Sequence, residues 1–194
     1  MIKISFITIK NLMANKLAKP LPELYELKNT IENNDWHHKD SVFDHTINVL
    51  INLEKLLKRN KKLNRYLTKR IKKHTRKQLL YLSALFHDIA KKETMIEKNG
   101  ITYCPSHEVK GALKARRILK RFYLPADEVA FITKIIRNHL LVYSMFEMNN
   151  KNAKSNNINN ILPELSILSM ADMLGSQFKL KSPTDFDKRM IAIA

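Results

Sequence analysis

Four histidines and several aspartates of this chain lie in five short fragments whose apolar neighbours recur with helical spacing. Burying a titratable side chain without a partner costs on the order of several kcal/mol. A shared cation removes that cost, because neutral imidazole and carboxylate groups are good ligands for divalent first-row metals. The sequence therefore predicts a metal centre inside a helical bundle. The fragments are Asp44-His45-Thr46, His87-Asp88, Ser106-His107-Glu108, Asn138-His139 and Ala171-Asp172.

Helices are expected to position these fragments, because nearly every segment after Pro22 has helical periodicity. One helix should begin at Pro22 and end near Asn34. Asp40 or Ser41 should cap the next helix, whose apolar stripe includes His45.

The later fragments have similar helical surroundings. The nearly continuous apolar segment Leu79–Ala90 is typical of a central helix, and His87-Asp88 lies near its C-terminal end. A turn is expected at Asn99-Gly100. The helices that follow should begin at Ser106, Pro125 and Pro163 and carry His107, His139 and Asp172.

The composition describes one globular domain with an excess of positive charge. At 194 residues, 44% of them hydrophobic, the chain can bury a sizeable core. Its 35 Lys and Arg against 18 Asp and Glu give a formal charge of +17, which favours anionic partners such as RNA, nucleotides or a negatively charged membrane face. Three glycines leave no glycine-rich phosphate loop, and a single cysteine excludes an internal disulfide or a cysteine-rich zinc module.

Targeting signals are weak. No apolar run approaches the length of a transmembrane helix, so we expect no membrane span and a cytoplasmic location. The basic leader through Lys19 has no acidic residue, which leaves organelle targeting as an alternative, although a loose tail or one short strand is favoured. The sequence carries no signal of oligomeric state.

The order His45, His87-Asp88, Asp172 resembles the HD-domain superfamily of metal-dependent phosphohydrolases, whose signature is H…HD…D. His107 and His139 resemble the additional histidines of members that hold two metals. The resemblance covers roughly residues 20 to 175. Local fragments are similar to the HD region of bacterial tRNA nucleotidyltransferases (CCA-adding enzymes): Pro22-Glu23-Leu24, Trp36-His37-His38, Val42-Phe43-Asp44-His45-Thr46, His87-Asp88-Ile89-Ala90-Lys91, and Ser106-His107-Glu108 with Gly111.

This resemblance implies an all-α fold, a single HD-type helical bundle with the metal site in its core. The implied segments are a basic N-terminal tail at 1–19, the HD domain at 20–181 with a mobile Asn-rich loop at 149–160, and a C-terminal tail at 182–194.

The resemblance also implies a ligand set, and the expected catalytic residues are Asp88 and Lys91. One or two divalent transition metals are expected (Mn, Fe, Co, Ni or Zn), with Mg less natural at an imidazole-rich site. Lys91 is expected to contact the substrate phosphate, and the alternative is an exposed lysine at a helix end. The first metal would be held by His45, His87, Asp88 and Asp172, and the second by His107 and His139 with Asp88 bridging.

Motifs that are missing from this sequence exclude some subgroups of the HD-domain superfamily. Lys91-Lys92 replaces the acidic residues of the guanosine tetraphosphate hydrolases, and the GYP signature of cyclic-di-GMP phosphodiesterases does not follow His139. No nucleotidyltransferase head precedes the HD-like region in this sequence, so we do not expect CCA addition. Of Trp36, His37 and His38, one histidine could face the substrate, but helix packing is the favoured interpretation.

Basic segments suggest contact with a polyanion. Lys55–Lys77 contains twelve Lys or Arg residues and no acid, and Tyr66 within it could stack on a base, although a solvated charged face is the ordinary interpretation. Further substrate-binding cations are expected at Lys110, Lys114 and Arg137.

Two functions are consistent with these features. The first is hydrolysis of a phosphomonoester or phosphodiester of a nucleotide or RNA end, such as a 2′,3′-cyclic phosphate. The alternative is a non-catalytic basic helical module that binds RNA or a partner protein and has a structural metal. The intact ligand set favours the enzyme, because a purely structural site needs fewer ligands.

Overall fold

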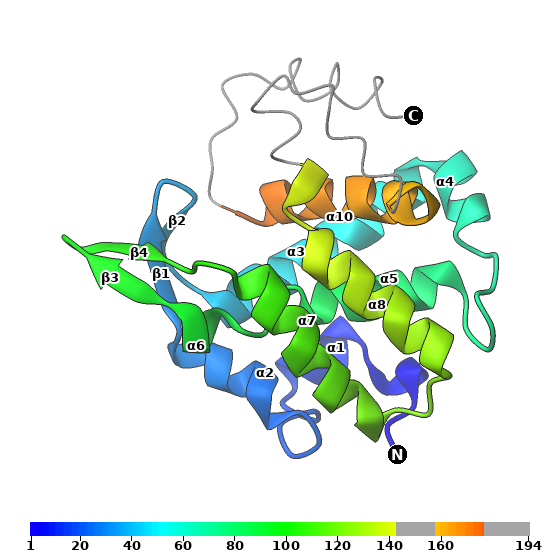
Figure 1. Ribbon diagram of the computed structural model, residues 1–194, viewed down its shortest axis with the longest axis horizontal. Coiled ribbons are helices and arrows are strands. Elements are labelled where there is room, and N and C mark those ends of the chain that lie inside the picture. Colours follow the sequence, from blue (N-terminus) through cyan, green and yellow to red (C-terminus); the bar gives the residue numbers. More distant parts are fainter. Residues whose placement is uncertain (143–157, 177–194) are drawn as a thin grey trace.

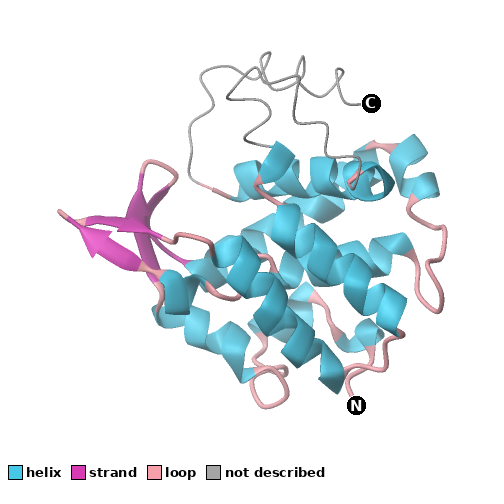
Figure 2. Ribbon diagram, in the orientation of Figure 1, coloured by secondary structure: helices cyan, strands magenta, loops and turns pink. Residues whose placement is uncertain are grey.

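The computed structural model describes residues 1–142 and 158–176. In these residues helices form the body of the molecule, and two short β-hairpins project from one side of it (Figures 1 and 2). This arrangement confirms the predicted all-α bundle. The long helices are α3 (Val42–Arg59), α5 (Arg76–Phe86), α7 (His107–Ile118), α8 (Ala126–Asn138) and α10 (Leu162–Gly175).

The core is formed where these helices pack against one another. Helix α10 packs against α3, α7 packs against α8, and α5 lies between α3 and α8. Each side chain buried there contributes about 1.5–3 kcal/mol through loss of apolar surface to water. Fully buried core residues include Leu50, Leu53, Leu82, Ile132, Ile135 and Leu168.

Local capping explains where the helices begin. Of the two candidates for α3, Ser41 is the cap, because its hydroxyl accepts a hydrogen bond from the Asp44 amide at 3.0 Å. Thr75 and Gln78 form a reciprocal capping box at the start of α5. Ser106 occupies the predicted cap position of α7, but its φ is +56° and its side chain makes no capping bond.

The prediction of one helix from Pro22 to about Asn34 is wrong beyond the first turns. Asn34 ends the first strand of a hairpin, because its side-chain oxygen accepts hydrogen bonds from the amides of Trp36 (2.9 Å) and His37 (3.1 Å) and so closes a turn. The elements are α2 (Pro22–Glu26), the 3-10 turn η2 (Leu27–Asn29), β1 (Ile31–Asn34) and β2 (His37–Ser41), with β1 and β2 antiparallel.

A second hairpin supports the first. The predicted turn at Asn99-Gly100 is confirmed, with φ values of +54° and +76° that suit these residues. It joins β3 (Ile96–Lys98) to β4 (Ile101–Tyr103). The Asn33 amide donates to the Thr102 hydroxyl at 2.7 Å, which fixes the first hairpin against the second.

The N-terminal segment is partly helical and packs on the core. It forms η1 (Ile4–Phe6) and α1 (Ile9–Met13), neither a loose tail nor a strand. Ile7, Leu12 and Leu17 are buried in the same core as the long helices. The domain boundaries proposed from the sequence stay predictions.

The remaining described elements are short. In the basic segment Lys55–Lys77, α3 ends, α4 follows, and an irregular stretch leads to α5. No helix in the described ranges is long and apolar enough to cross a membrane. Most of the predicted loop at 149–160 and the whole tail at 182–194 lie outside the described residues. The short helices are α4 (Lys61–Tyr66), α6 (Lys91–Thr94), η3 (Leu119–Arg121) and η4 (Asn159–Ile161).

Candidate metal centre

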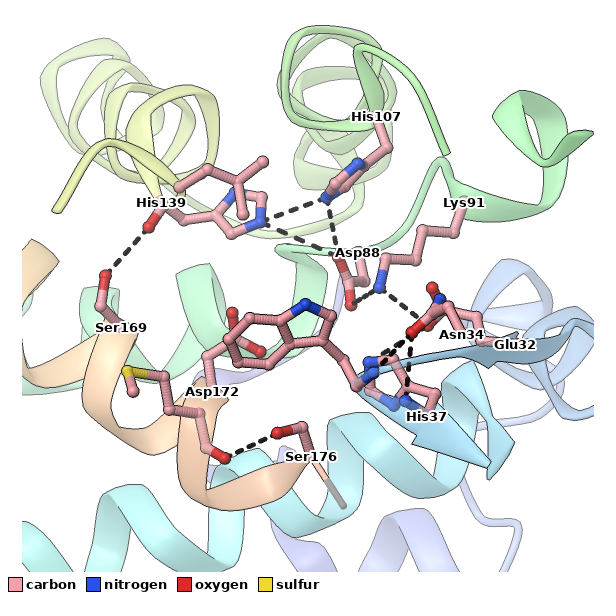
Figure 3. A pocket seen from close by; sticks show the side chains of 13 residues that line it. Glu32, Asn34, His37, Asp88, Lys91, His107, His139, Ser169, Asp172 and Ser176 are labelled. Carbon is pink, nitrogen blue, oxygen red and sulfur yellow. Dashed lines mark hydrogen bonds and ion pairs between the residues drawn. The ribbon is translucent and has the colours of Figure 1, made fainter. Parts of the chain in front are cut away.

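The predicted ligands converge because each lies at or near the end of a helix. The five helices pack with these ends together, and four of these side chains, Asp88, His107, His139 and Asp172, line one pocket (Figure 3). His45 and His87 do not line it but lie against the Asp88 carboxylate. All four imidazoles and the Asp88 carboxylate are buried. The positions are His45 in the first turns of α3, His87-Asp88 directly after α5, His107 at the start of α7, His139 directly after α8, and Asp172 in the last turn of α10.

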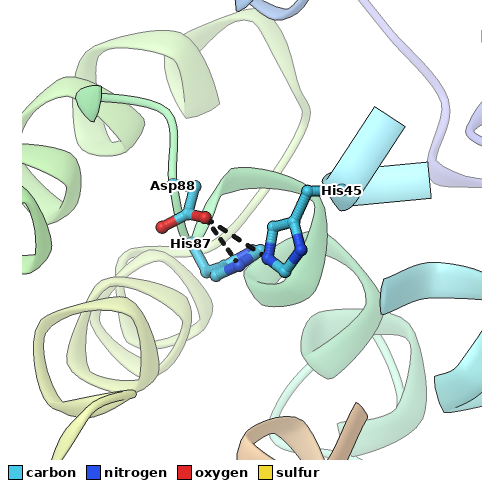
Figure 4. Close-up of side chains that lie close together, drawn as sticks. All are labelled: His45, His87 and Asp88. Atoms are coloured by element: carbon cyan, nitrogen blue, oxygen red, sulfur yellow. Dashed lines mark ion pairs between the residues drawn. The ribbon is translucent and has the colours of Figure 1, made fainter. Parts of the chain in front are cut away.

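The Asp88 carboxylate lies between two pairs of histidines. Its Oδ2 is 3.1 Å from Nε2 of His87 and 3.5 Å from Nε2 of His45 (Figure 4). Its Oδ1 is 3.2 Å from Nε2 of His107 and 3.9 Å from Nε2 of His139. One carboxylate therefore presents a different oxygen to each pair, which is the arrangement of a bridging ligand.

Asp172 is the second carboxylate that lies beside His45 and His87. Its Oδ1 lies 2.8 Å from Nε2 of His45 and 3.4 Å from Nε2 of His87. Burial disfavours the charged form of Asp172, but the two adjacent imidazoles of His45 and His87 outweigh that effect and hold its pKa well below the usual range. His45 and His87 thus face two ionised carboxylates, those of Asp88 and Asp172.

Backbone carbonyls orient three of the imidazoles. A carbonyl oxygen only accepts, so the bonded Nδ1 carries the proton, and a neutral ring then presents the lone pair of Nε2 to the centre of the cluster. The Nδ1–O distances are 2.7 Å for His87 to Ala84, His107 to Cys104 and His139 to Ile136.

The cluster has unusual titration behaviour without a cation. Burial opposes charge on His87, but Asp88 and Asp172 outweigh it and raise the pKa of His87 to about 10. Burial together with the charge on His87 lowers the pKa of His139 to about 4. Opposite shifts among adjacent imidazoles show that proximity to the two carboxylates, which differs between the rings, decides their charge.

These residues fit a divalent metal. Ligand atoms at about 2.0–2.2 Å from one ion lie about 3 Å from one another, which matches the separations above. The buried Nε2 of His87 makes no hydrogen bond, as expected of an atom reserved for another partner. Within the part of the chain that the structure describes, two ligand groups are compatible with an ion, His45-His87-Asp88 and Asp88-His107-His139.

Lys91 lies beside this cluster and not at an exposed helix end. Its ammonium group is 3.0 Å from Oδ2 of Asp88 and 2.8 Å from Oε2 of Glu32, and the residue is 7% exposed. Burial disfavours its charge, but the two carboxylates outweigh burial and raise the pKa of Lys91 above its ordinary value. The alternative interpretation of an exposed lysine is therefore wrong, and Lys91 is a fixed cation on the wall of the pocket.

The first hairpin supplies site residues that the sequence does not indicate or that were expected to pack between helices. Glu32, Asn34, Trp36 and His37 line the pocket, which has a volume of about 190 Å³. Burial lowers the pKa of His37 to about 4, so its imidazole is neutral at pH 7. The interpretation of Trp36 and His37 as helix-packing residues is wrong, because they belong to β2 and its turn. In the sequence, the fragment Trp36-His37-His38 could have indicated this part of the pocket, whereas no motif indicated Glu32.

Three other predicted substrate residues lie apart from the pocket. Lys114 donates to the Ile89 carbonyl at 2.9 Å and pairs with Glu93. Lys110 is exposed beside it on α7, and Arg137 is exposed on the outer side of α8. The pocket does not include these side chains, and their role stays a prediction.

Comparison with known proteins places the chain in a family. The HD domain family model matches residues 42–175, more than half of the chain, and the chain therefore belongs to this family. The match covers the helices that carry all the proposed ligands.

Curated relatives extend the comparison. A bifunctional uridylyltransferase/uridylyl-removing enzyme of Legionella pneumophila (strain Paris) is 32% identical over 110 residues, 56% of this chain and 12% of the relative. The enzyme of the same name from Azotobacter vinelandii (strain DJ / ATCC BAA-1303) is 32% identical over 128 residues, 65% of this chain and 13% of the relative. The chain thus spans only about an eighth of these relatives. They are not tRNA nucleotidyltransferases, so they do not support the narrower resemblance, whereas the family model confirms the HD superfamily.

Proposed function

We propose that this protein is a metal-dependent phosphohydrolase that cleaves a phosphomonoester or phosphodiester of a nucleotide or of an RNA end, such as a 2′,3′-cyclic phosphate. The observation that carries the proposal is the Asp88 carboxylate, which lines the pocket and presents one oxygen to each of two histidine pairs. Membership of the HD domain family supports hydrolysis that depends on a metal.

The proposed ligands follow from the two groups. His45, His87, Asp88 and Asp172 would hold one ion, and Asp88 would share the second with the other two histidines, His107 and His139. A divalent transition metal such as Mn, Fe, Co, Ni or Zn supplies activation of water and neutralisation of phosphoryl charge.

The residues of the chain supply positioning and fixed charge. Lys91 is protonated and held by Glu32 and Asp88, so its ammonium can bind a phosphoryl oxygen without a large change of position. Lys110, Lys114 and Arg137 lie outside the pocket, and for them we propose only long-range attraction of an anionic substrate.

A nucleotide phosphoester is supported by the names of the relatives. These names include removal of a uridylyl group, which breaks a phosphoester bond of a nucleotide.

Metal content and hydrolysis test the proposal together. We expect close to two equivalents of metal per chain and hydrolysis of bis(p-nitrophenyl) phosphate or a 2′,3′-cyclic nucleotide. Asp88→Asn removes the charge of the bridging group and should abolish both. Glu54→Gln, which neutralises an exposed acid on α3, is the matched control and should change neither. A protein that binds no metal after reconstitution with Mn, Co or Zn would contradict the proposal.

The alternative is a non-catalytic module that binds RNA, with a structural metal. Exposed cations on α4 and the following stretch favour it, since Lys61, Lys62 and Arg65 are all exposed. Tyr66 does not, because Lys69 and Arg76 already lie over its ring at 5.3 and 4.9 Å, which leaves a poor stacking surface for a base. Under this alternative Asp88→Asn mainly lowers stability, and RNA binding weakens steeply with salt.

A further inference from the structure

A groove lies between α7 and α8, outside the metal pocket. It has a volume of about 610 Å³, and no residue lines both it and the metal pocket. Its floor is apolar, formed by residues such as Ala112, Leu113, Val129 and Ala130. Leu113 is 55% exposed, although it lies in the middle of α7. Such an apolar surface on the outer side of two packed helices requires an explanation beyond the stability of the bundle.

Four cations surround this floor, and among the described residues no carboxylate lines it. Arg116 and Lys120 lie on the α7 side, and Lys134 and Arg137 lie on α8. Within the described ranges, the side chains of Arg116, Lys120 and Arg137 make no ion pair or hydrogen bond, whereas Lys134 donates to Asn160 at 2.8 Å.

Two neighbouring cations outside the groove behave differently. Lys114 on α7 is paired with Glu93, and Arg121 in η3 with Glu23 through both terminal nitrogens of its guanidinium. Arg116, Lys120 and Arg137 are thus available to an external anion, while these two neighbours serve the fold.

We propose that this α7–α8 groove binds an acidic amphipathic helix of a partner protein. A helix with an apolar stripe at i, i+3, i+4 and i+7 would bury that stripe on the floor. Asp or Glu residues flanking the stripe would then meet Arg116 and Lys120 on one side and Lys134 and Arg137 on the other. This site does not depend on the metal centre or on any hydrolytic activity.

Other occupants fit the groove less well. A second copy of this chain would bring another +17 charge against four cations, which opposes association. A single-stranded nucleic acid needs exposed aromatic rings on which bases stack, but Phe122, the aromatic residue of the groove, is 4% exposed. An acidic polypeptide satisfies both the apolar floor and the charged rim.

Fluorescence anisotropy with a labelled synthetic peptide tests this proposal on the full chain. The peptide has about 16 residues, with Leu at i, i+3, i+4 and i+7 and Glu at the flanking positions. A scrambled peptide of the same composition lacks the stripe and controls for net charge. A single-stranded oligoribonucleotide of equal charge is the third probe.

Two kinds of variant separate the rim from the floor. The double substitution Arg116→Glu/Arg137→Glu should weaken binding of the patterned peptide about tenfold or more, because two attractions become repulsions. Lys61→Glu/Lys62→Glu makes the same change of net charge on α4 and should have little effect. Leu113→Gln should weaken binding without any change of charge.

Several outcomes would overturn the proposal. These are equal binding of the patterned and scrambled peptides, equal losses in both charge-reversal variants, or no binding of the patterned peptide. Tighter binding of the oligoribonucleotide that is lost in Arg116→Glu/Arg137→Glu would assign the groove to nucleic acid. A dimer of the wild-type chain in sedimentation that Leu113→Gln dissociates would assign it to a second copy.

Discussion

The ammonium of Lys91 lies 3.0 Å from Oδ2 of Asp88, the same oxygen that faces His45 and His87. Glu32 of the first hairpin holds the other side of that ammonium at 2.8 Å. One buried cation is therefore shared between a carboxylate of the proposed metal centre and a carboxylate of the hairpin. Its stabilising role and its proposed phosphate-binding role can be separated by mutation.

Replacement of Lys91 by Met should destabilise the protein by about 3–5 kcal/mol, because Asp88 and Glu32 lose a buried partner. Hydrolysis should fall as well, since the fixed positive charge at the pocket is lost. Urea unfolding in EDTA and initial rates with a cyclic nucleotide measure the two effects separately.

The double variant Glu32→Gln/Lys91→Met distinguishes the two roles. Neutralising Glu32 removes part of the unpaired charge, so much of the lost stability should return. The rate should not recover, because the ammonium is still absent. Recovery of the rate together with stability would show that Lys91 acts only in folding.

Removal of metal should lower the thermal stability. A ligand at 100 times its Kd stabilises the folded state by about 2.7 kcal/mol, and for a domain of this size that corresponds to a fall in Tm of about 5–10 °C in EDTA. Readdition of Mn or Zn should restore it. The Asp88→Asn variant should melt at the same temperature with and without EDTA, and an equal EDTA effect in this variant would argue against the proposed ligands.

Gly175→Ala should destabilise the contact between α10 and α3. A Cβ at Gly175 would lie 2.7 Å from Cγ2 and 3.0 Å from the backbone nitrogen of Val49, so the two helices must move apart. We expect a loss of about 1–3 kcal/mol from overpacking, with weaker metal binding because Asp172 moves relative to His45. Gly111→Ala is the control, because its new Cβ would lie 3.4 Å from the carbonyl oxygen of His87, which is an ordinary van der Waals contact.

Features set by residues close together in the sequence could be predicted, whereas features set by contacts between distant residues could not. His45, His87 and His139 were predictable because helical spacing and local caps place them on inward faces. The β1–β2 hairpin was not predictable from periodicity, because its strands are set by the turn at Asn34 and by a distant bond from Asn33 to Thr102. The contribution of Glu32 to the pocket depends on that tertiary pairing.

Predictions for charged residues were limited for the same reason. A run of cations gives no information on which residues are paired, and the acids that neutralise Arg76 and Lys114 are Glu164 and Glu93. Arg76, counted in the basic segment, is thus a structural residue. The exposed cations at the groove could be identified only once these pairs were known.

The buried carboxylate of Glu128 should make stability depend on pH far from the metal centre. Its Oε1 accepts the amide hydrogens of Lys73 and His74 at 2.6 Å, and its Oε2 lies 2.7 Å from Nδ1 of His74. Burial disfavours the charged form, but these hydrogen bonds outweigh burial and lower the pKa of Glu128 below its ordinary value of 4.5. A carboxyl group with a lower pKa in the folded state stabilises the fold above its unfolded pKa, and that stabilisation is lost as pH falls through the folded value.

Glu128→Gln should therefore cost about 1–3 kcal/mol near pH 7, and the difference from wild type should shrink as the pH falls below about 4. Urea unfolding in EDTA across this range measures the free energy of unfolding of both proteins. Groups at the metal centre titrate equally in both, so the difference reports Glu128 together with its partner His74. Glu54→Gln, at an exposed position on α3, should match wild type at every pH. A difference that grows towards acid pH would mean that the folded protein does not favour the ionised form of Glu128.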